Sequence, residues 1–171
     1  MYANNMYDRD DVIDMLEQSN LIEKEPSREA LMDAITAWDY ASNTSRCMTT
    51  RMILTTHRKL LKRLRPDIAG KWRTCDVWIG GIKKTFVSEE LIKKMMMGWI
   101  KLCNYDKVKG SKKDKEKFAK NWHIMFEEIH PFEDGNGRVG RILYNVHRFK
   151  LGLPIHIIRF EDRWEYYEWF K

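Results

Sequence analysis

The chain of 171 residues lacks any apolar run of about 18 residues, the length that a membrane-spanning helix needs. It also lacks the pattern of a secretory signal peptide, because acids stand in "MYANNMYDRDDVIDML" where a basic and then an apolar stretch belong. We therefore expect a cytoplasmic protein with no membrane partner. Internal repeats and low-complexity segments are missing too, which favours one globular domain.

Cysteine is scarce, with only three in the chain: Cys47, Cys75 and Cys103. No two of them form a CxxC pair, so the sequence argues against a zinc site or a disulfide framework. We expect three reduced thiols.

Acidic residues are outnumbered, since 31 Lys and Arg face 25 Asp and Glu for a net charge of +6. Much of the excess lies in "KVKGSKKDKEKFAK", residues 107–120, where both signs mix. Surfaces that bind nucleic acid more often place aromatic residues between the cations. Nucleic-acid binding is therefore the less favoured interpretation of this segment, and a solvated loop with a helix start is the favoured one.

Apolar spacing predicts a mostly helical chain. The expected helices cover residues 10–19, 27–41, 50–64, 88–103, 114–130, 137–151 and 162–170. Residues 71–87 differ, because β-branched and aromatic residues alternate around Gly80-Gly81 and predict a β-hairpin. One hairpin is not stable alone in water, so it must lie on the helical body or take a partner strand. The expected fold class is all-α with a single hairpin.

The stretch "HPFEDGNGR", residues 130–138, carries the strongest chemical signal. Pro131 ends the preceding helix, and the next helix is expected to begin near Asn136 or Gly137. The first turn of that helix offers unpaired backbone N–H groups, which bind anions. Arg138 and Arg141 both project near this end, and two arginines suit a di- or triphosphate.

Two further side chains complete a reactive set. Asp134, beside the expected polyphosphate, suits Mg²⁺. His130 can accept a proton at neutral pH. Together the residues suit attack by a hydroxyl on a nucleotide phosphate, with charge neutralised by metal, arginines and backbone dipoles.

The longer string "HPFEDGNGRVGR" resembles the signature of Fic-domain (Fido) proteins, His-Pro-Phe-x-Asp/Glu-Gly-Asn-Gly/Lys-Arg-x-x-Arg, at every specified position. The likeness extends over roughly residues 55–170. It implies a compact helical core with a hairpin flap over the active site, and Mg²⁺-dependent transfer of AMP from ATP to a Ser, Thr or Tyr hydroxyl of a target protein. It divides the chain into N-terminal helices (1–50) and a core (51–171), with the flap at 73–87 and the active-site loop and helix at 130–149.

The resemblance also implies roles. His130 is the general base, Asp134 holds Mg²⁺, and the nucleotide phosphates are bound by Gly135, Asn136, Gly137, Arg138 and Arg141. Phe132 anchors the loop. Gly137 favours nucleotidyl transfer, because the variant with Lys at this position, as in Doc toxins, transfers phosphate. A wall of the base pocket is expected from Asn145, Tyr166 and Tyr167.

The hairpin receives a role from the same resemblance. A flap of this family aligns the main chain of the target by adding an edge strand, which is β-augmentation. The expected docking residues are Thr74, Cys75, Asp76, Val77, Trp78 and Ile79. The alternative is a hairpin that only covers the core.

Many Fic proteins carry an inhibitory helix with the pattern Ser/Thr-x-x-x-Glu-Gly/Asn, whose glutamate pairs with the second arginine of the motif. Ser19 to Glu23 matches the first part, within the segment 19–24, and implies a pair between Glu23 and Arg141. Lys24 departs from the pattern, because Gly or Asn takes the left-handed cap conformation more readily. The alternative is a solvent-facing glutamate at a helix end.

Several interpretations stay open from sequence. The same pocket could transfer UMP or another phosphoryl portion. The chain could also be a silent module, either a toxin held by an antitoxin or a basic nucleic-acid-binding protein. A general base such as His130 argues against silence, because a binding module has no need of one.

Overall fold

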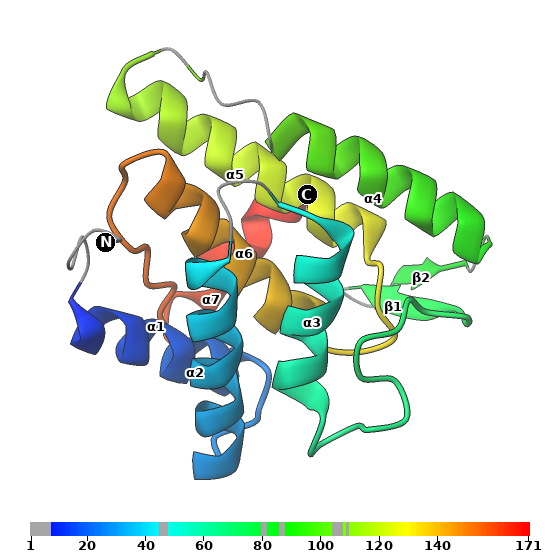
Figure 1. Ribbon diagram of the computed structural model, residues 1–171. Helices are drawn as coiled ribbons and strands as arrows, with labels where there is room; N and C mark the ends of the chain where they lie inside the picture. Colours follow the sequence, from blue (N-terminus) through cyan, green and yellow to red (C-terminus); the bar gives the residue numbers. More distant parts are fainter. Residues whose placement is uncertain (1–7, 45–47, 80–81, 86–87, 104–107, 109) are drawn as a thin grey trace.

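The computed structural model describes residues 8–171 except 45–47, 80–81, 86–87, 104–107 and 109. The elements follow in the order α1 (Arg9–Ile22), α2 (Arg28–Asn43), α3 (Thr50–Leu61), β1 (Val77–Ile79), β2 (Ile82–Lys84), α4 (Glu89–Cys103), α5 (Lys112–Ile129), α6 (Asn136–Lys150), α7 (Arg163–Tyr167) and a short 3₁₀ helix η1 (Glu168–Phe170). Figure 1 shows α6 in the middle of the body, with α4 packed against α5. The predicted all-α class with one hairpin is confirmed.

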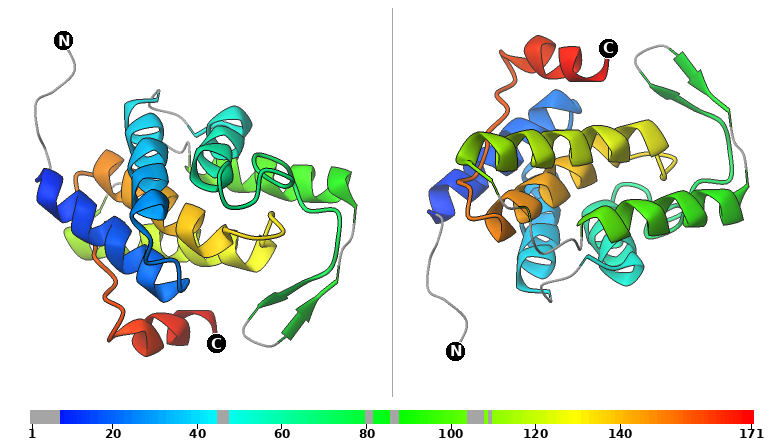
Figure 2. Two further views of the ribbon diagram at one scale, coloured as in Figure 1. Left: turned by 90° about the horizontal axis from the view of Figure 1, so that it is seen from below. Right: turned by 90° about the horizontal axis from the view of Figure 1, so that it is seen from above.

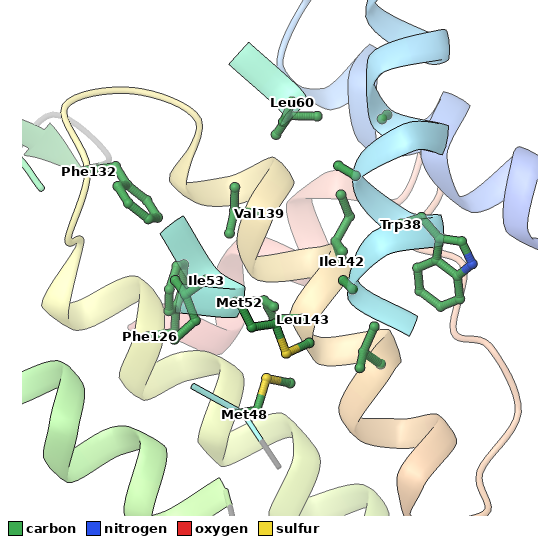
Figure 3. Close-up of a cluster of buried hydrophobic side chains, with 14 of the residues drawn as sticks. Trp38, Met48, Met52, Ile53, Leu60, Phe126, Phe132, Val139, Ile142 and Leu143 are labelled. Atoms are coloured by element: carbon green, nitrogen blue, oxygen red, sulfur yellow. The ribbon is translucent and has the colours of Figure 1, made fainter. Parts of the chain in front are cut away.

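Helix α6 lies at the centre of the body, with twelve of its fifteen residues buried. It contacts α1, α2, α3 and α5. Figure 3 shows its apolar residues Val139, Ile142 and Leu143 beside Met52 and Ile53 of α3. Each fully buried side chain of this size contributes about 1.5–3 kcal/mol. Helix α6, which follows the motif, is thus packed on several sides, and this packing fixes the position of its N-terminus.

Side-chain caps set most of the helix starts. The predicted caps are confirmed: Ser27 accepts from the Ala30 N–H, and Ser88 accepts from the Leu91 N–H at 3.1 Å. Helix α5 begins two residues before the expected Asp114, because Ser111 and Asp114 form a capping box. Helix α3 ends at Leu61 rather than residue 64, and turns lead on towards Pro66.

Helix α1 extends beyond the expected residues 10–19 and ends at Ile22. Lys24 follows with φ of 60°, in the left-handed region. The Glu25 N–H donates to the Asn20 carbonyl at 2.9 Å and the Lys24 N–H to the Leu21 carbonyl at 3.0 Å, which is a Schellman motif. The helix ends as the inhibitory pattern requires, although lysine stands at the position where Gly or Asn was expected.

The hairpin is shorter than predicted. Val77 pairs with Lys84 and Ile79 with Ile82 in an antiparallel register, so Thr74, Cys75 and Asp76 precede the strand. The predicted Gly80-Gly81 turn lies outside the described residues. Figure 2 shows the hairpin standing away from the helices, on the same side of the body as the C-terminal α7. Among the described helices, none has the length and apolar character to cross a membrane.

Candidate active site

The motif loop, residues 130–135, joins α5 to α6 and is anchored by Phe132. The ring of Phe132 stacks on His57, with centroids 3.8 Å apart and planes 4° from parallel, and on Trp72 at 5.2 Å. Asn136 closes the loop with two hydrogen bonds of 2.9 Å, one from the Phe132 N–H and one to its carbonyl. The Asn136 side chain therefore braces the loop, and only its backbone remains for an anion.

His57 on α3 packs against the motif loop. This residue was not identified from the sequence. Its Nδ1 accepts from the Gly70 N–H at 2.8 Å, so Nε2 carries the hydrogen and donates to the Asp134 carbonyl at 3.0 Å. Burial lowers the pKa of His57 to about 4. The ring is therefore neutral at pH 7, with both nitrogens in use.

Arg73 links the segment before β1, which we call the hairpin stem, to the motif loop. Arg73 was not identified from the sequence either. Its backbone N–H donates to the Pro131 carbonyl and its Nε to the His130 carbonyl, each at 2.9 Å. Its Nη1 donates to the Cys75 carbonyl at 2.9 Å. One buried guanidinium thus fixes the backbone of the expected base and the residue that leads into β1.

His130 ends α5 in the left-handed conformation, with φ of 48° and ψ of 63°. Its ring lies with Nδ1 3.3 Å from the Glu127 carbonyl. A carbonyl can only accept, so Nδ1 carries the hydrogen in this contact and Nε2 is the nitrogen left to take a proton. This is the tautomer that a general base needs.

The N-terminus of α6 is where the sequence leads us to expect an anion site. Gly135 precedes the helix with φ of 77°, and α6 begins at Asn136 as predicted. Arg138 is only 3% exposed, yet its Nε and Nη1 have no hydrogen-bond partner in the described part of the chain. A buried guanidinium with unpaired donors beside a helix N-terminus is suited to an anionic ligand such as phosphate.

Arg141 is occupied by the N-terminal segment. Its Nη2 donates to the Glu23 Oε1 at 2.7 Å, and its Nε donates to the Ser19 Oγ at 2.8 Å. Burial by itself would raise the pKa of Glu23, but the charges of Arg141 and Arg138 outweigh it and lower this pKa. The pairing expected for Glu23 and Arg141 is present, with Glu23 ionised at neutral pH.

Glu23 also covers the start of α6. A Cβ added to Gly137 would clash with the Glu23 Oε1. The carboxylate therefore lies against the first turn of the helix, where the sequence predicts phosphate. The Glu23 carboxylate thus lies where the sequence leads us to expect a phosphate group.

The three residues expected at the base pocket lie in different settings. Asn145 is fully buried. Its Oδ1 accepts from the His156 N–H at 2.8 Å, and its Nδ2 donates to the His156 carbonyl at 3.1 Å. The Tyr166 hydroxyl is buried between His123 at 2.9 Å and Arg141 at 3.5 Å. Of the three, only Tyr167 has an exposed side chain. The side chain of Asn145 therefore holds the backbone of His156.

Asp134 has the chemistry of a magnesium ligand. Its Oδ1 accepts from the Gly135 N–H at 2.6 Å, and its Oδ2 lies 3.9 Å from the Arg138 Nη2, at a half-exposed position. Within the described ranges, no three His, Cys, Asp or Glu residues gather around a possible metal position. A single carboxylate fits Mg²⁺, which commonly binds one or two carboxylates together with substrate phosphates.

Glu127 is a buried carboxyl beneath the site that the sequence did not mark. Its Oε1 has no hydrogen-bond partner among the described residues, and its Oε2 lies 3.9 Å from the His130 Nδ1. Burial raises the pKa of Glu127 to about 8; Arg141 opposes this and Glu23 adds to it. The group is therefore mostly protonated at pH 7.

Glu127→Gln should stabilise the protein increasingly as pH rises. A carboxyl whose pKa is raised on folding contributes stability below its unfolded pKa, and that contribution is lost as pH rises through the folded pKa. Glutamine does not titrate, so the variant keeps this contribution. Its free energy of unfolding should therefore rise relative to that of the parent protein between about pH 4.5 and pH 8, by on the order of a few kcal/mol. Urea unfolding of both proteins across this range measures the difference. A constant difference in stability would contradict the prediction, and exposed Glu128→Gln is the control.

Comparison with known proteins shows which family the chain resembles. Residues 47–147 match the model of the Fic/DOC family. A protein adenylyltransferase Fic from Nematostella vectensis is 34% identical over 132 residues, which is 73% of this chain and 28% of that protein. Protein adenylyltransferase fic-1 from Caenorhabditis briggsae is 35% identical over 115 residues, or 67% of this chain and 22% of that protein. The match thus spans about a quarter of the length of each of these two relatives.

Solved structures agree on the fold. Fic-1 from Caenorhabditis elegans superposes with a TM-score of 0.78 and 22% identity, covering 94% of this chain and 54% of the other. A Fic domain-containing signalling protein from Bacteroides thetaiotaomicron gives a TM-score of 0.75 and 22% identity, covering 96% and 75%. The family model matches more than half of the chain and includes the complete motif around His130, and the chain therefore belongs to the Fic/DOC family.

Proposed function

We propose that this protein transfers AMP from ATP to a hydroxyl of a target protein, with Mg²⁺, and that Glu23 holds it in a resting state. The observation that carries the proposal is the buried guanidinium of Arg138, whose Nε and Nη1 are unpaired beside the start of α6. The relatives named protein adenylyltransferase support the choice of reaction.

Each residue of the motif has its own role in the proposed AMP transfer. The Nε2 of His130 takes the proton of the target hydroxyl, whose oxygen forms a bond to the α-phosphorus of ATP while the bond to the leaving pyrophosphate breaks. The backbone N–H groups of Asn136 and Gly137 would stabilise the charge that develops on the phosphoryl oxygens, while that of Gly135 donates to Asp134. Asp134 would hold Mg²⁺, which supplies further positive charge to the phosphates.

The resting state follows from the contacts of Arg141. Its guanidinium is committed to Glu23 and to Ser19, and the Glu23 carboxylate lies against Gly137. A γ-phosphate that needs Arg141 must displace this carboxylate. Two anions cannot share the place without strong repulsion, so ATP binds in a productive position only when Glu23 moves away.

The hairpin is the proposed docking place for the target. Trp78 on β1 is 66% exposed, which is unusual for a tryptophan that only covers a core. Arg73 links the hairpin stem to the His130 backbone, so a main chain aligned on the hairpin would be positioned relative to the base. Such docking rests on backbone hydrogen bonds and puts little demand on the target sequence.

Intact-mass spectrometry tests the reaction. The Glu23→Gly protein is incubated with ATP, UTP or GTP, Mg²⁺ and candidate targets, and the added mass identifies the transferred group. A mass increase of one AMP per site supports the proposal. A gain of UMP or of a single phosphate would favour the alternative donors. A protein that binds ATP and modifies neither itself nor a target would favour a silent binding module.

Asp134→Asn should remove the effect of Mg²⁺ on ATP binding. The amide keeps an oxygen to accept from the Gly135 N–H, but it loses the charge that attracts the ion. Calorimetry in the Glu23→Gly background should show that Mg²⁺ tightens ATP binding when Asp134 is present. In Asp134→Asn, the affinity for ATP should be the same with and without Mg²⁺.

Asp67→Asn, at the exposed contact with Arg65, is the matched control and should keep the full effect of Mg²⁺. A full Mg²⁺ effect in Asp134→Asn would place the metal elsewhere.

A further inference from the structure

A cavity lies outside the active site and is lined by residues of α5, α6 and the C-terminal segment. Its volume is about 740 Å³, large enough for a ligand the size of a nucleotide. Lys113, Lys117 and Lys120 line it from α5, and Arg148 lines it from α6. Figures 1 and 2 show α5 running alongside α6, with the C-terminal segment close by.

The three lysines form one row of charge. Their spacing of four and three residues places them on the same face of α5, over a length of about 10 Å. None of them forms an ion pair with a described residue. Lys120 instead lies over the ring of Trp169, with its Nζ 4.3 Å from the centroid. The row is therefore free to meet an anion.

Arg148 faces this row with a guanidinium that is already held in place. Its Nε donates to the Pro154 carbonyl at 2.9 Å, and its Nη1 to the Tyr144 hydroxyl at 3.4 Å. The residue is buried, so the charge is presented with little loss of side-chain freedom on binding. Tyr144 in turn contacts the His156 Nδ1 at 2.9 Å.

Two acids, Asp114 and Glu116, also line the cavity and offset part of this charge. Asp114 accepts from both the N–H and the hydroxyl of Ser111, so its carboxylate is committed to the start of α5. The Glu116 Oε1 lies 4.0 Å from the Arg148 Nη2, so this carboxylate forms an ion pair with Arg148 without a hydrogen bond. Four cations against two carboxylates leave the cavity positive.

We propose that this cavity binds a chain of phosphates, such as inorganic triphosphate or the phosphate tail of a nucleotide. A row of lysines about 10 Å long matches several linked phosphates better than one, because a single phosphate cannot reach all three ammonium groups. The site is separate from the active site: Arg148 follows Arg138 by ten residues of α6, about 15 Å along the helix axis.

Calorimetry with inorganic triphosphate tests the proposal, using the full chain and variants of exposed or half-exposed lysines. Lys117→Gln/Lys120→Gln should weaken binding by about tenfold or more, the loss of roughly 1.4 kcal/mol. Lys117→Arg/Lys120→Arg should stay within about threefold of the parent, since the charge is kept. Arg138→Gln separates this cavity from the active site, and binding at the lysine row should persist in it.

The outcomes separate the sources of the phosphate chain. If Arg138→Gln binds ATP and triphosphate with equal affinity, and this affinity depends on the lysines, the cavity recognises the phosphates alone. If it binds ATP more tightly than triphosphate, the cavity recognises a nucleotide. The proposal is overturned if triphosphate does not bind, or if Arg138→Gln abolishes binding while the lysine-to-glutamine pair does not weaken it. Equal affinity for orthophosphate, or tighter lysine-dependent binding of a single-stranded oligonucleotide, would also overturn it.

Discussion

His130→Ala should lower AMP transfer by about 10²–10⁴-fold while ATP binding stays close to that of the parent protein. The Nδ1 of His130 faces the Glu127 carbonyl, so Nε2 is the nitrogen that can accept a proton. In the proposed site, other groups bind the phosphates, namely the start of α6 and the arginines. Loss of the ring therefore removes the proton acceptor and leaves the nucleotide site.

The comparison is best made in a Glu23→Gly background, so that the resting state does not mask the loss. His130 has a positive φ, a conformation that costs an L-residue such as alanine roughly 1–2 kcal/mol. His130→Asn is the second variant, because asparagine tolerates this conformation and offers no base. Transfer at the parental rate in both variants would exclude His130 as the base.

Glu23→Gly should raise the rate of AMP transfer at least severalfold. The substitution removes the carboxylate that contacts Arg141 at 2.7 Å and lies against Gly137, and it leaves the Ser19 contacts to Arg141 in place. Arg141 and the first turn of α6 are then open to the phosphates of ATP. Glycine is also well suited to the end of a helix, so α1 should persist.

Two matched variants show whether the charge of Glu23 is responsible. Glu23→Gln keeps the size of the side chain and removes its charge, so it should activate the protein as well, although less than glycine. Glu17→Gln changes an exposed glutamate on the same helix and should have no effect. Activation by Glu17→Gln, or a fully active parent, would mean that Glu23 does not restrain the enzyme.

Local signals explain how much of this site could be predicted. The motif from His130 to Arg141 is continuous in sequence, and Pro131 with the following glycines already fixes a loop and then a helix start. The contact between Glu23 and Arg141 was also predictable, because Ser19 and Glu23 match a spacing pattern of the family. The order of the helices followed from apolar spacing and from caps such as Ser27.

The supporting residues could not be predicted, because their roles arise from contacts between distant segments. His57 reaches the Asp134 carbonyl across 77 positions, and Arg73 reaches that of His130 across 57. No local pattern distinguishes either from a surface residue. Asn145 was expected at a base pocket for its position on α6, but its amide is taken up by the His156 backbone, a contact that only the folded chain shows.

The most direct measurement compares labelled ATP on the parent protein and on Glu23→Gly, side by side, with the label on either the α- or the γ-phosphate. The account predicts that protein acquires the α-label and no γ-label, and acquires it at least severalfold faster with Glu23→Gly. Equal rates in the two proteins would contradict the resting role of Glu23, and incorporation of the γ-label would contradict AMP transfer itself.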